Sequence, residues 1–437
     1  MKRLILVWAL VAGGASGQNA YISNQGAHTV SVIDTSNNTV TATVNVGHYP
    51  SGVVVNPAGT RAYVVNSGDG TISVIDTNTN SVIDTVTVGS GPYGVAVNPA
   101  GTRAYVTNTA DRTVSVINLA SNLVTATVAV GSGPRGVAVN PAGTRAYVTN
   151  LNDDTVSVID TSNNTVTATV NVGLSPLGVA VNPAGTQAYV VNSVGGLGLS
   201  LRAKTSKLDG PQTYVVNIGF AGNISVIDTS NNTVTATVTV GLSPNGVAVN
   251  PAGTRAYVTN SSDNTVSVID TGNNTVEATV TVGHSPNGVA VNPAGTRAYV
   301  ANLGNGTVSV IDTSNNAVTA TITGFNEPTA FGFFISPVSI PAITPPLQIT
   351  PLAPMTLSVV PNQSLQATGT ATVVANQRGT WTATTSTPWL SLTQSIGAFP
   401  GVVAGTSNAA GLAAGIYTGS ISVAGTALGG TQTISIP

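Results

Sequence analysis

Three histidines, His28, His48 and His284, are the only histidines in the 437-residue chain and its first candidates for metal chemistry. Neutral imidazole is a good ligand for zinc or copper, so histidines that share one surface sector could form a metal site. The positions that correspond to His48 in the repeat described below carry serine or leucine, which indicates that unlike side chains are tolerated there. We therefore expect solvated loop histidines and assign no metal site.

Residue sets with the spacing of a catalytic group are missing from the sequence. The absence of cysteine excludes thiolate nucleophiles, thiolate metal ligands and disulfides. There is no Gly-x-Ser-x-Gly nucleophile elbow, and Glu277 and Glu327 are the only glutamates. Loops rich in Asp and Asn, such as 150–154, lack the spacing of a dedicated calcium site and are explained by Asx turns. The sequence predicts no catalytic residue, no cofactor and no enzyme.

Charged side chains gather in one segment, about 193–218, which interrupts an otherwise regular pattern. It contains Arg202, Lys204 and Lys207, which are candidate contacts for a ligand or partner. The alternative is a tolerated surface insertion. The Tyr-Val-Val-Asn at 214–217 duplicates the one at 189–192, so either segment could supply the next strand.

Composition and the N-terminus point to export. Only 6% of residues are charged and the formal net charge is −2, which leaves no basic surface for nucleic acid. Lys2 and Arg3 precede an apolar run over 4–12 and small residues up to Gly17, which predicts a signal peptide over 1–17; the alternative is an uncleaved anchor. No later stretch is long and apolar enough to span a bilayer. We expect a periplasmic, cell-surface or secreted protein without a membrane span after cleavage.

A 42-residue repeat organises most of the chain. Its phase is marked by seven tyrosines, the last two displaced by the insertion: Tyr21, Tyr63, Tyr105, Tyr147, Tyr189, Tyr257 and Tyr299. Each copy contains four strand signals separated by turn residues; in the second copy they are 52–56, 62–66, 71–76 and 81–88. A four-stranded sheet with apolar faces is stable only when stacked between like sheets. The repeat predicts an all-β chain with a seven-bladed β-propeller of four-stranded blades over 18–337.

The phase of the repeat also predicts how the ring closes. The copies begin near Ala20 with the second strand of a blade, and the last segment, 332–336, aligns with the first-strand segment 288–292. The last segment should therefore complete the N-terminal blade.

Arginines recur at the start of the second strand, and aspartates at the end of the third. Antiparallel pairing predicts that Arg61 lies opposite Asp76 and that the same rung repeats around the ring. Asn118 and Gln187 depart from the pattern. We interpret the rungs as exposed structural ion pairs worth less than about 1 kcal/mol each.

The recurring motifs carry a family resemblance. Ala-Tyr-Val-Thr-Asn at 104–108, 146–150 and 256–260, together with Thr-Val-Ser-Val-Ile-Asp and Gly-Val-Ala-Val-Asn-Pro, resembles the YVTN family of β-propeller repeats. The resemblance implies an exported or surface-layer protein with a binding or structural function. Related propellers include lactonases and haem or quinone enzymes, but fold alone does not transfer an activity.

A second module is expected after a proline-rich linker at 338–355. Residues 356–437 alternate like the strands of a small β-sandwich and resemble BACON-type immunoglobulin-like domains, for which carbohydrate binding has been proposed. Trp381 and Trp389 could stack on sugars; the alternative is burial in the core of the sandwich.

Together these features predict an exported, non-enzymatic binding or adhesion protein of the bacterial surface, with a protein or carbohydrate ligand. The alternatives are a structural surface-layer component and a propeller enzyme, lactonase-like or redox. The ligand and the oligomeric state do not follow from the sequence.

Overall fold

The computed structural model describes residues 18–193, 221–330 and 332–336, and the backbones of the strands between residues 350 and 436. The chain divides into two compact units, Met1–Ser339 and Ile340–Pro437. Within the described residues there is no helix long and apolar enough to cross a membrane.

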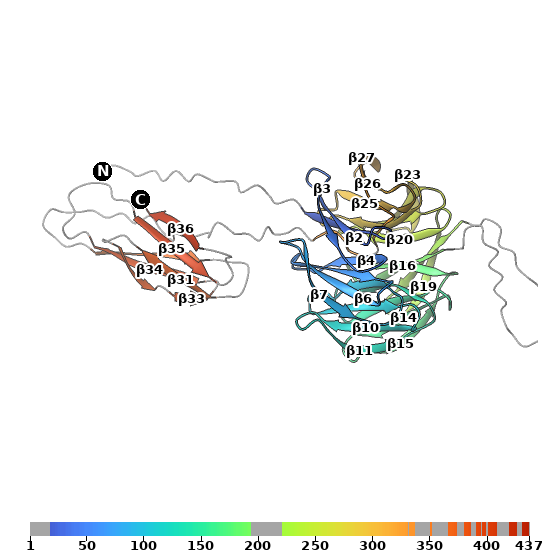
Figure 1. The fold of residues 1–437 in the computed structure, drawn as a ribbon, viewed down its shortest axis with the longest axis horizontal. Helices are drawn as coiled ribbons and strands as arrows, with labels where there is room; N and C mark the ends of the chain where they lie inside the picture. The colour runs from blue at the N-terminus through green and yellow to red at the C-terminus, as the bar shows by residue number, and fades with distance from the viewer. Residues whose placement is uncertain are drawn as a thin grey trace, which may run out of the picture. The chain divides into compact units, whose positions relative to one another are not determined.

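The first unit is a ring of seven four-stranded antiparallel sheets, called blades 1 to 7 here (Figure 1). This confirms the predicted fold class. Blade 1 contains β28 (Pro328–Thr329), β1 (Asn19–Asn24), β2 (Thr29–Asp34) and β3 (Thr39–Asn45); blade 2 contains β4 (Pro50–Val55), β5 (Arg61–Asn66), β6 (Thr71–Asp76) and β7 (Ser81–Thr87); blade 3 contains β8 (Pro92–Val97), β9 (Arg103–Asn108), β10 (Thr113–Asn118) and β11 (Leu123–Ala129).

The other four blades follow the same plan. Blade 4 contains β12 (Pro134–Val139), β13 (Arg145–Asn150), β14 (Thr155–Asp160) and β15 (Thr165–Asn171); blade 5 contains β16 (Pro176–Val181), β17 (Gln187–Asn192), β18 (Asn223–Asp228) and β19 (Thr233–Thr239). Blade 6 contains β20 (Pro244–Val249), β21 (Arg255–Asn260), β22 (Thr265–Asp270) and β23 (Thr275–Thr281); blade 7 contains β24 (Pro286–Val291), β25 (Arg297–Asn302), the 3₁₀ turn η1 (Leu303–Asn305), β26 (Thr307–Asp312) and β27 (Ala317–Thr323).

Turn chemistry fixes the first hairpin of blades 2 to 7. In blade 2 the side-chain Oδ1 of Asn56 accepts hydrogen bonds from the backbone N of Thr60 (2.9 Å) and of Arg61 (3.0 Å). Gly59 has φ of 70°, a left-handed conformation that glycine adopts without steric cost. The turn therefore returns the chain antiparallel to β4 and sets the start of β5.

Apolar side chains fill the space between neighbouring blades. One cluster joins Tyr63 and Ile72 of blade 2 to Val95, Ala104 and Ile117 of blade 3. The seven repeat tyrosines are all at most 2% exposed. Because each sheet buries both faces against its neighbours, apolar burial between blades is the main term that holds the ring together.

The asparagine that ends each second strand donates to two side chains of the third strand, and in blades 2, 3 and 6 it also accepts a hydrogen bond from the loop that arrives from the preceding blade. In blade 2 the Asn66 side chain donates to Thr71 Oγ1 (3.0 Å) and Ser73 Oγ (2.9 Å), and accepts from the backbone N of Gly47 (3.1 Å) in the loop that arrives from blade 1. Asn66 is fully buried. Its hydrogen bonds offset the cost of burying an amide, which explains the Asn of the repeated motif.

The ring closes in blade 1 with strands from both ends of the repeat region. Pro328 and Thr329 pair with Asn24 and Ser23, and Ile335 forms a bridge with Ala20. The predicted closure is confirmed, although the segment after β28 follows β1 through isolated contacts instead of a continuous strand.

In the second unit, strand backbones pair in two four-stranded sheets. Their orders are β29-β30-β34-β32 and β33-β31-β35-β36, with β29 (Thr350–Pro351), β30 (Gln366–Val373), β31 (Thr380–Thr385), β32 (Leu390–Gln394), β33 (Ile396–Ala398), β34 (Gly401–Asn408), β35 (Gly419–Gly425) and β36 (Thr431–Ile436). The packing of these sheets as a sandwich stays a prediction.

Candidate ligand-binding site

The propeller has two faces with different loops. One, called the arginine face here, carries the turns between first and second strands, such as 56–60, and between third and fourth strands, such as 77–80. The other, called the mouth face, carries the loops between second and third strands, such as 67–70, and the loops between blades, such as 46–49. The three histidines lie on the mouth face, and the arginine–aspartate rungs lie on the other.

On the arginine face, side chains bond to the backbone of the next blade. Arg103 Nη1 donates to the carbonyl of Thr161 (2.7 Å), and the arginines of four other blades make the same contact: Arg61 to Leu119, Arg145 to Thr229, Arg255 to Thr313 and Arg297 to Thr35. The predicted register is confirmed, because Arg61 pairs with Asp76. The ion-pair interpretation is corrected: in the described part of the chain, the ion pair recorded on this face joins Arg255 to Glu277 instead (2.6 Å).

The aspartates of the rungs cap the turn that follows them. Asp160 Oδ1 accepts hydrogen bonds from the backbone N (2.8 Å) and the hydroxyl (2.6 Å) of Ser162. These hydrogen bonds, with a smaller contribution from Arg145, hold the pKa of the Asp160 carboxyl below its usual value. Serine bonds lower the pKa of Asp228 and Asp312 in the same way. The rungs are therefore structural.

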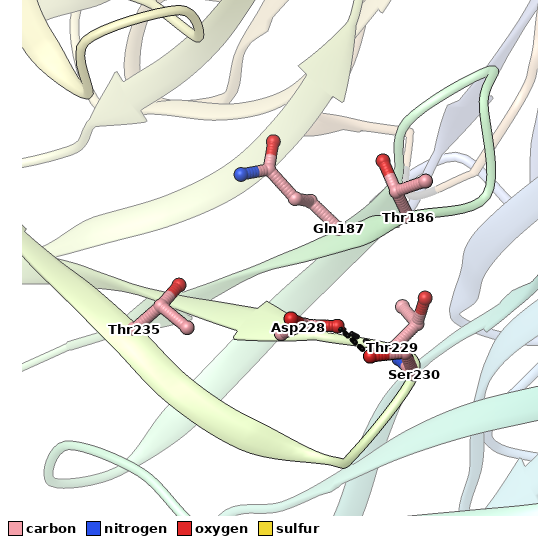
Figure 2. Close-up of a pocket in the computed structure, with 6 residues that line it drawn as sticks. All are labelled: Thr186, Gln187, Asp228, Thr229, Ser230 and Thr235. Carbon is pink, nitrogen blue, oxygen red and sulfur yellow. Dashed lines mark hydrogen bonds between the residues drawn. The ribbon is translucent and has the colours of Figure 1, made fainter.

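Blade 5 has Gln187 where five blades have arginine, and a hollow of about 440 Å³ lies there (Figure 2). Gln187 and Thr186 line one side of it, and Asp228, Ser230 and Thr235 line the other. Gln187 Oε1 accepts a hydrogen bond from the hydroxyl of Tyr189 (2.9 Å) and has no recorded bond to blade 6. The hollow therefore marks a missing blade-to-blade contact.

Two of the three histidines meet on the mouth face. The rings of His28 and His48 are 4.9 Å apart between centroids, and His48 Nδ1 lies 2.7 Å from Asp69 Oδ1. His48 is 64% exposed at its side chain. Among the described residues, no group of three or more His, Asp or Glu is arranged to hold a metal ion. His284, in the loop before β24, has no recorded contact with the other two.

His28 accepts a hydrogen bond from a loop between blades, and in other blades a different side chain accepts the equivalent bond. Its Nδ1 accepts a hydrogen bond from the backbone N of Tyr49 (3.2 Å). In blades 4 and 6 the same kind of bond runs from Ser175 N to Asp154 and from Ser285 N to Asn264. The histidine pair thus belongs to the bracing of loops between blades.

The first strand of each blade lies innermost. Around the ring, each first strand contacts the first strands of both neighbouring blades, while the fourth strands lie outside (Figure 1). The approach is close: a Cβ added at Gly52 would lie 2.7 Å from the carbonyl oxygen of Tyr93 in the next blade. Only glycine fits this position without a shift of the neighbouring backbone.

One variable residue per blade stands at the start of this innermost strand, on the mouth face. It follows a proline in all seven copies and precedes a glycine in six. The seven residues, called the axial ring here, are Ser51, Tyr93, Arg135, Leu177, Asn245, Asn287 and Thr329. Six residue types occur between nearly constant neighbours, so the blades differ from one another where they converge.

Tyr93 and Arg135 of the axial ring line a cavity of about 350 Å³, called the axial cavity here. Gln25, Ser67 and Thr109, from loops of blades 1, 2 and 3, also line it. The Arg135 guanidinium carbon lies 4.3 Å from the centre of the Tyr93 ring, a cation–π contact. Burial raises the pKa of the Tyr93 hydroxyl, and the nearby Arg135 charge opposes this effect.

The described residues at the axial cavity include none of the site residues predicted from sequence. Arg202, Lys204, Lys207 and Trp389 are outside the described residues, and Trp381 lies on β31, where its backbone pairs with Gly397 and Gly425. Of the two candidate segments for the second strand of blade 5, 187–192 pairs with β18. The axial cavity was missed, although the variable residue between a constant Pro and Gly signals it in the sequence.

The described residues therefore define a seven-bladed β-propeller whose blades differ at the axis of the mouth face. No family model matches the chain. A segment of 41 residues is 56% identical to the PE-PGRS family protein PE_PGRS18 of Mycobacterium tuberculosis, a match that spans 9% of this chain and 9% of that protein.

Two solved structures share the fold. The hydrazine synthase of Kuenenia stuttgartiensis matches with a TM-score of 0.59 and 22% identity, over 69% of this chain and 94% of that chain. A protein of unknown function from Desulfotomaculum acetoxidans matches with a TM-score of 0.61 and 15% identity, over 74% of this chain and 99% of that chain. At these identities the likeness concerns the fold alone.

Proposed function

We propose that this chain is an exported, non-enzymatic binding or adhesion protein of the bacterial surface, and that the propeller holds its ligand at the axial cavity. The observation that carries the proposal is the axial ring, where six residue types replace one another between constant neighbours. Binding sites in repeat proteins are built by varying few positions on a constant scaffold. The ligand is a glycan or a protein.

The remaining surface offers less asymmetry. The arginine face repeats one contact in five blades, and its hollow at Gln187 arises from a missing arginine. Catalysis needs one asymmetric constellation of acid, base or nucleophile. The axial cavity is lined by amide, hydroxyl, phenol and guanidinium groups, which suit recognition through hydrogen bonds.

Export and family membership belong to the same proposal. The signal-peptide pattern over 1–17 supports export, and the N-terminus of the protein purified from its native host should be Gln18 by mass spectrometry; an intact residue 1 would contradict cleavage. The repeated Tyr-Val-Thr-Asn motifs support assignment to the YVTN repeats. The pattern over 356–437 supports a BACON-like module, with Trp381 and Trp389 as its candidate sugar contacts.

A screen of the full chain on glycan and protein arrays tests the binding function. The axial variant Tyr93→Ser/Arg135→Ser uses the residue that blade 2 carries at the same position, so the fold should tolerate it. The control variant Gln187→Ser changes the hollow on the arginine face. We expect wild-type binding that the axial variant loses and the control keeps.

Other results would overturn parts of the proposal. Binding that the axial variant retains would move the site away from the axial cavity. A wild-type chain that binds nothing and forms two-dimensional arrays in electron micrographs as its concentration rises would favour a structural surface-layer component.

A further inference from the structure

The guanidinium of Arg135 is held at the axial cavity without a counter-ion. Its Nε is buried with no hydrogen-bond partner, and no ion pair joins it to any carboxylate in the described ranges. The repeat arginines of the opposite face differ, because each donates to a backbone carbonyl of the next blade. Arg135 therefore retains hydrogen-bonding capacity inside a cavity of about 350 Å³.

Tyr93 orients this charge. The Arg135 guanidinium carbon lies 4.3 Å from the centre of the Tyr93 ring, a cation–π contact that uses none of the guanidinium N–H groups. Two of these N–H groups match the two oxygens of a carboxylate. The aspartate of the adjacent loop, Asp111, accepts a hydrogen bond from Ser90 N (2.7 Å) and so braces the loop between blades. Desolvation at the axis strengthens a charge-assisted hydrogen bond relative to one in water.

The rest of the lining suits hydroxyl groups. Gln25, Ser67 and Thr109 add one amide and two hydroxyl groups to a lining that also contains Gly91, Pro92 and Ala110. Outside this lining, on blades 6 and 7 of the axial ring, the side-chain Oδ1 atoms of Asn245 and Asn287 are buried and have no hydrogen-bond partner among the described residues. Amide oxygens accept hydrogen bonds from hydroxyls, which a simple carboxylate does not offer.

Resting on the proposed binding function, we propose that the axial cavity recognises an acidic saccharide, with a sugar carboxylate held by the guanidinium edge of Arg135 and sugar hydroxyls held by the neighbouring amides and hydroxyls. The cavity volume is at the lower end of the range for small-molecule sites, which fits one or two sugar rings.

Isothermal titration of the full chain with trigalacturonic acid tests this assignment. Replacing Arg135 by Gln should weaken binding about ten- to hundredfold, because a charge-assisted bidentate contact is lost. Arg135→Lys should recover little, since an ammonium keeps the charge but not the planar fork. The matched control is Arg112→Gln, an exposed arginine on the same face, which should bind within about twofold of wild type.

The probes separate the possible outcomes. The neutral trisaccharide made by reducing the three carboxyl groups should bind at least about tenfold more weakly than the acid. Equal binding of the two sugars, an equal loss of binding in Arg135→Gln and Arg112→Gln, or no wild-type binding to trigalacturonic acid would overturn the saccharide assignment. Binding of hexaglutamate that depends on Arg135, without sugar binding, would overturn it in favour of an acidic peptide. In each of these cases the array screen with the axial variant decides the proposed function separately, and melting curves of each variant report whether it folds.

Discussion

The two faces of the propeller use the same repeat in opposite ways. On the arginine face, five blades place a guanidinium on a carbonyl of the next blade, and the side chain is the same each time. On the mouth face, the axial ring carries six residue types in its seven positions. A side chain whose partner is backbone meets the same partner in every copy, so it repeats. A side chain at the axis meets unlike side chains, so it can vary.

The largest expected effect concerns the buried tyrosines, whose hydroxyls reach the arginine face. Tyr299 donates to Asn38 Oδ1 (3.1 Å), and burial raises the pKa of Tyr21 to about 12. In the unfolded chain the tyrosine hydroxyl releases its proton near pH 10. The stability that the raised pKa of Tyr21 contributes is therefore complete below pH 10 and is lost between pH 10 and about 12, at about 1.4 kcal/mol per pH unit for Tyr21 alone. Burial raises the pKa of five more repeat tyrosines: Tyr63, Tyr147, Tyr189, Tyr257 and Tyr299.

Denaturant unfolding at pH 8 to 12 measures this loss. The Tyr21→Phe variant should show a shallower decline above pH 10, because it lacks one of the titrating groups. A free energy of unfolding that stays constant to pH 12 would contradict the account.

Removing one blade-to-blade contact should be the next largest effect. Arg103→Ala leaves the Thr161 carbonyl without its donor, and we expect the free energy of unfolding to fall by about 2 kcal/mol. Arg112→Ala, on the mouth face, should change it by less than about 0.5 kcal/mol. Denaturant melts compare the two; equal losses would remove the distinction between the faces.

Restoring the missing contact should stabilise the ring. Gln187→Arg places a guanidinium where it can reach the Thr271 carbonyl of blade 6, as Arg145 reaches Thr229 one blade earlier. We expect a gain of about 1 kcal/mol in the free energy of unfolding and unchanged ligand binding. If the variant instead abolished binding on the arrays, the hollow of Figure 2 would be the ligand site.

The smallest effect is expected at His28. Asn264 occupies the equivalent loop position with the same left-handed backbone, so His28→Asn should shift stability by less than about 0.5 kcal/mol. His28→Val should cost more, because a β-branched residue is strained at φ of 58°. Thermal melts of the two variants test this, and equal melting temperatures would show that the loop conformation is not required.

The fold could be predicted because its determinants are local and repeated. Strand signals, turn residues such as Gly59 and the phase of the copies are sufficient to place four strands per blade and to close the ring in blade 1. The register that pairs Arg61 with Asp76 also follows from one hairpin. The hydrogen-bond partner of the Arg61 side chain could not be predicted in this way, because the Leu119 carbonyl lies in the sheet of the next blade. Strand pairing within one blade does not show how neighbouring sheets stack.

The contact between Tyr93 and Arg135 could not be predicted for a similar reason. Tyr93 and Arg135 are 42 positions apart, and their contact arises from the convergence of first strands at the axis. Two of the three histidines, by contrast, lie in neighbouring loops of the mouth face, and their rings touch.

The closure of blade 1 has a mechanical consequence. The segments that enter and leave the ring meet in one sheet, where Tyr21 N donates to Phe334 O (2.8 Å), Ser336 N to Asn19 O (2.8 Å) and Gln25 N to Glu327 O (3.1 Å). A pulling force applied between residues 18 and 336 is therefore carried by these antiparallel contacts of one blade, while the other six blades lie outside the load path. Under tension between these two residues the ring would open at this seam first, and the contacts of blade 1 would set the force that the ring withstands.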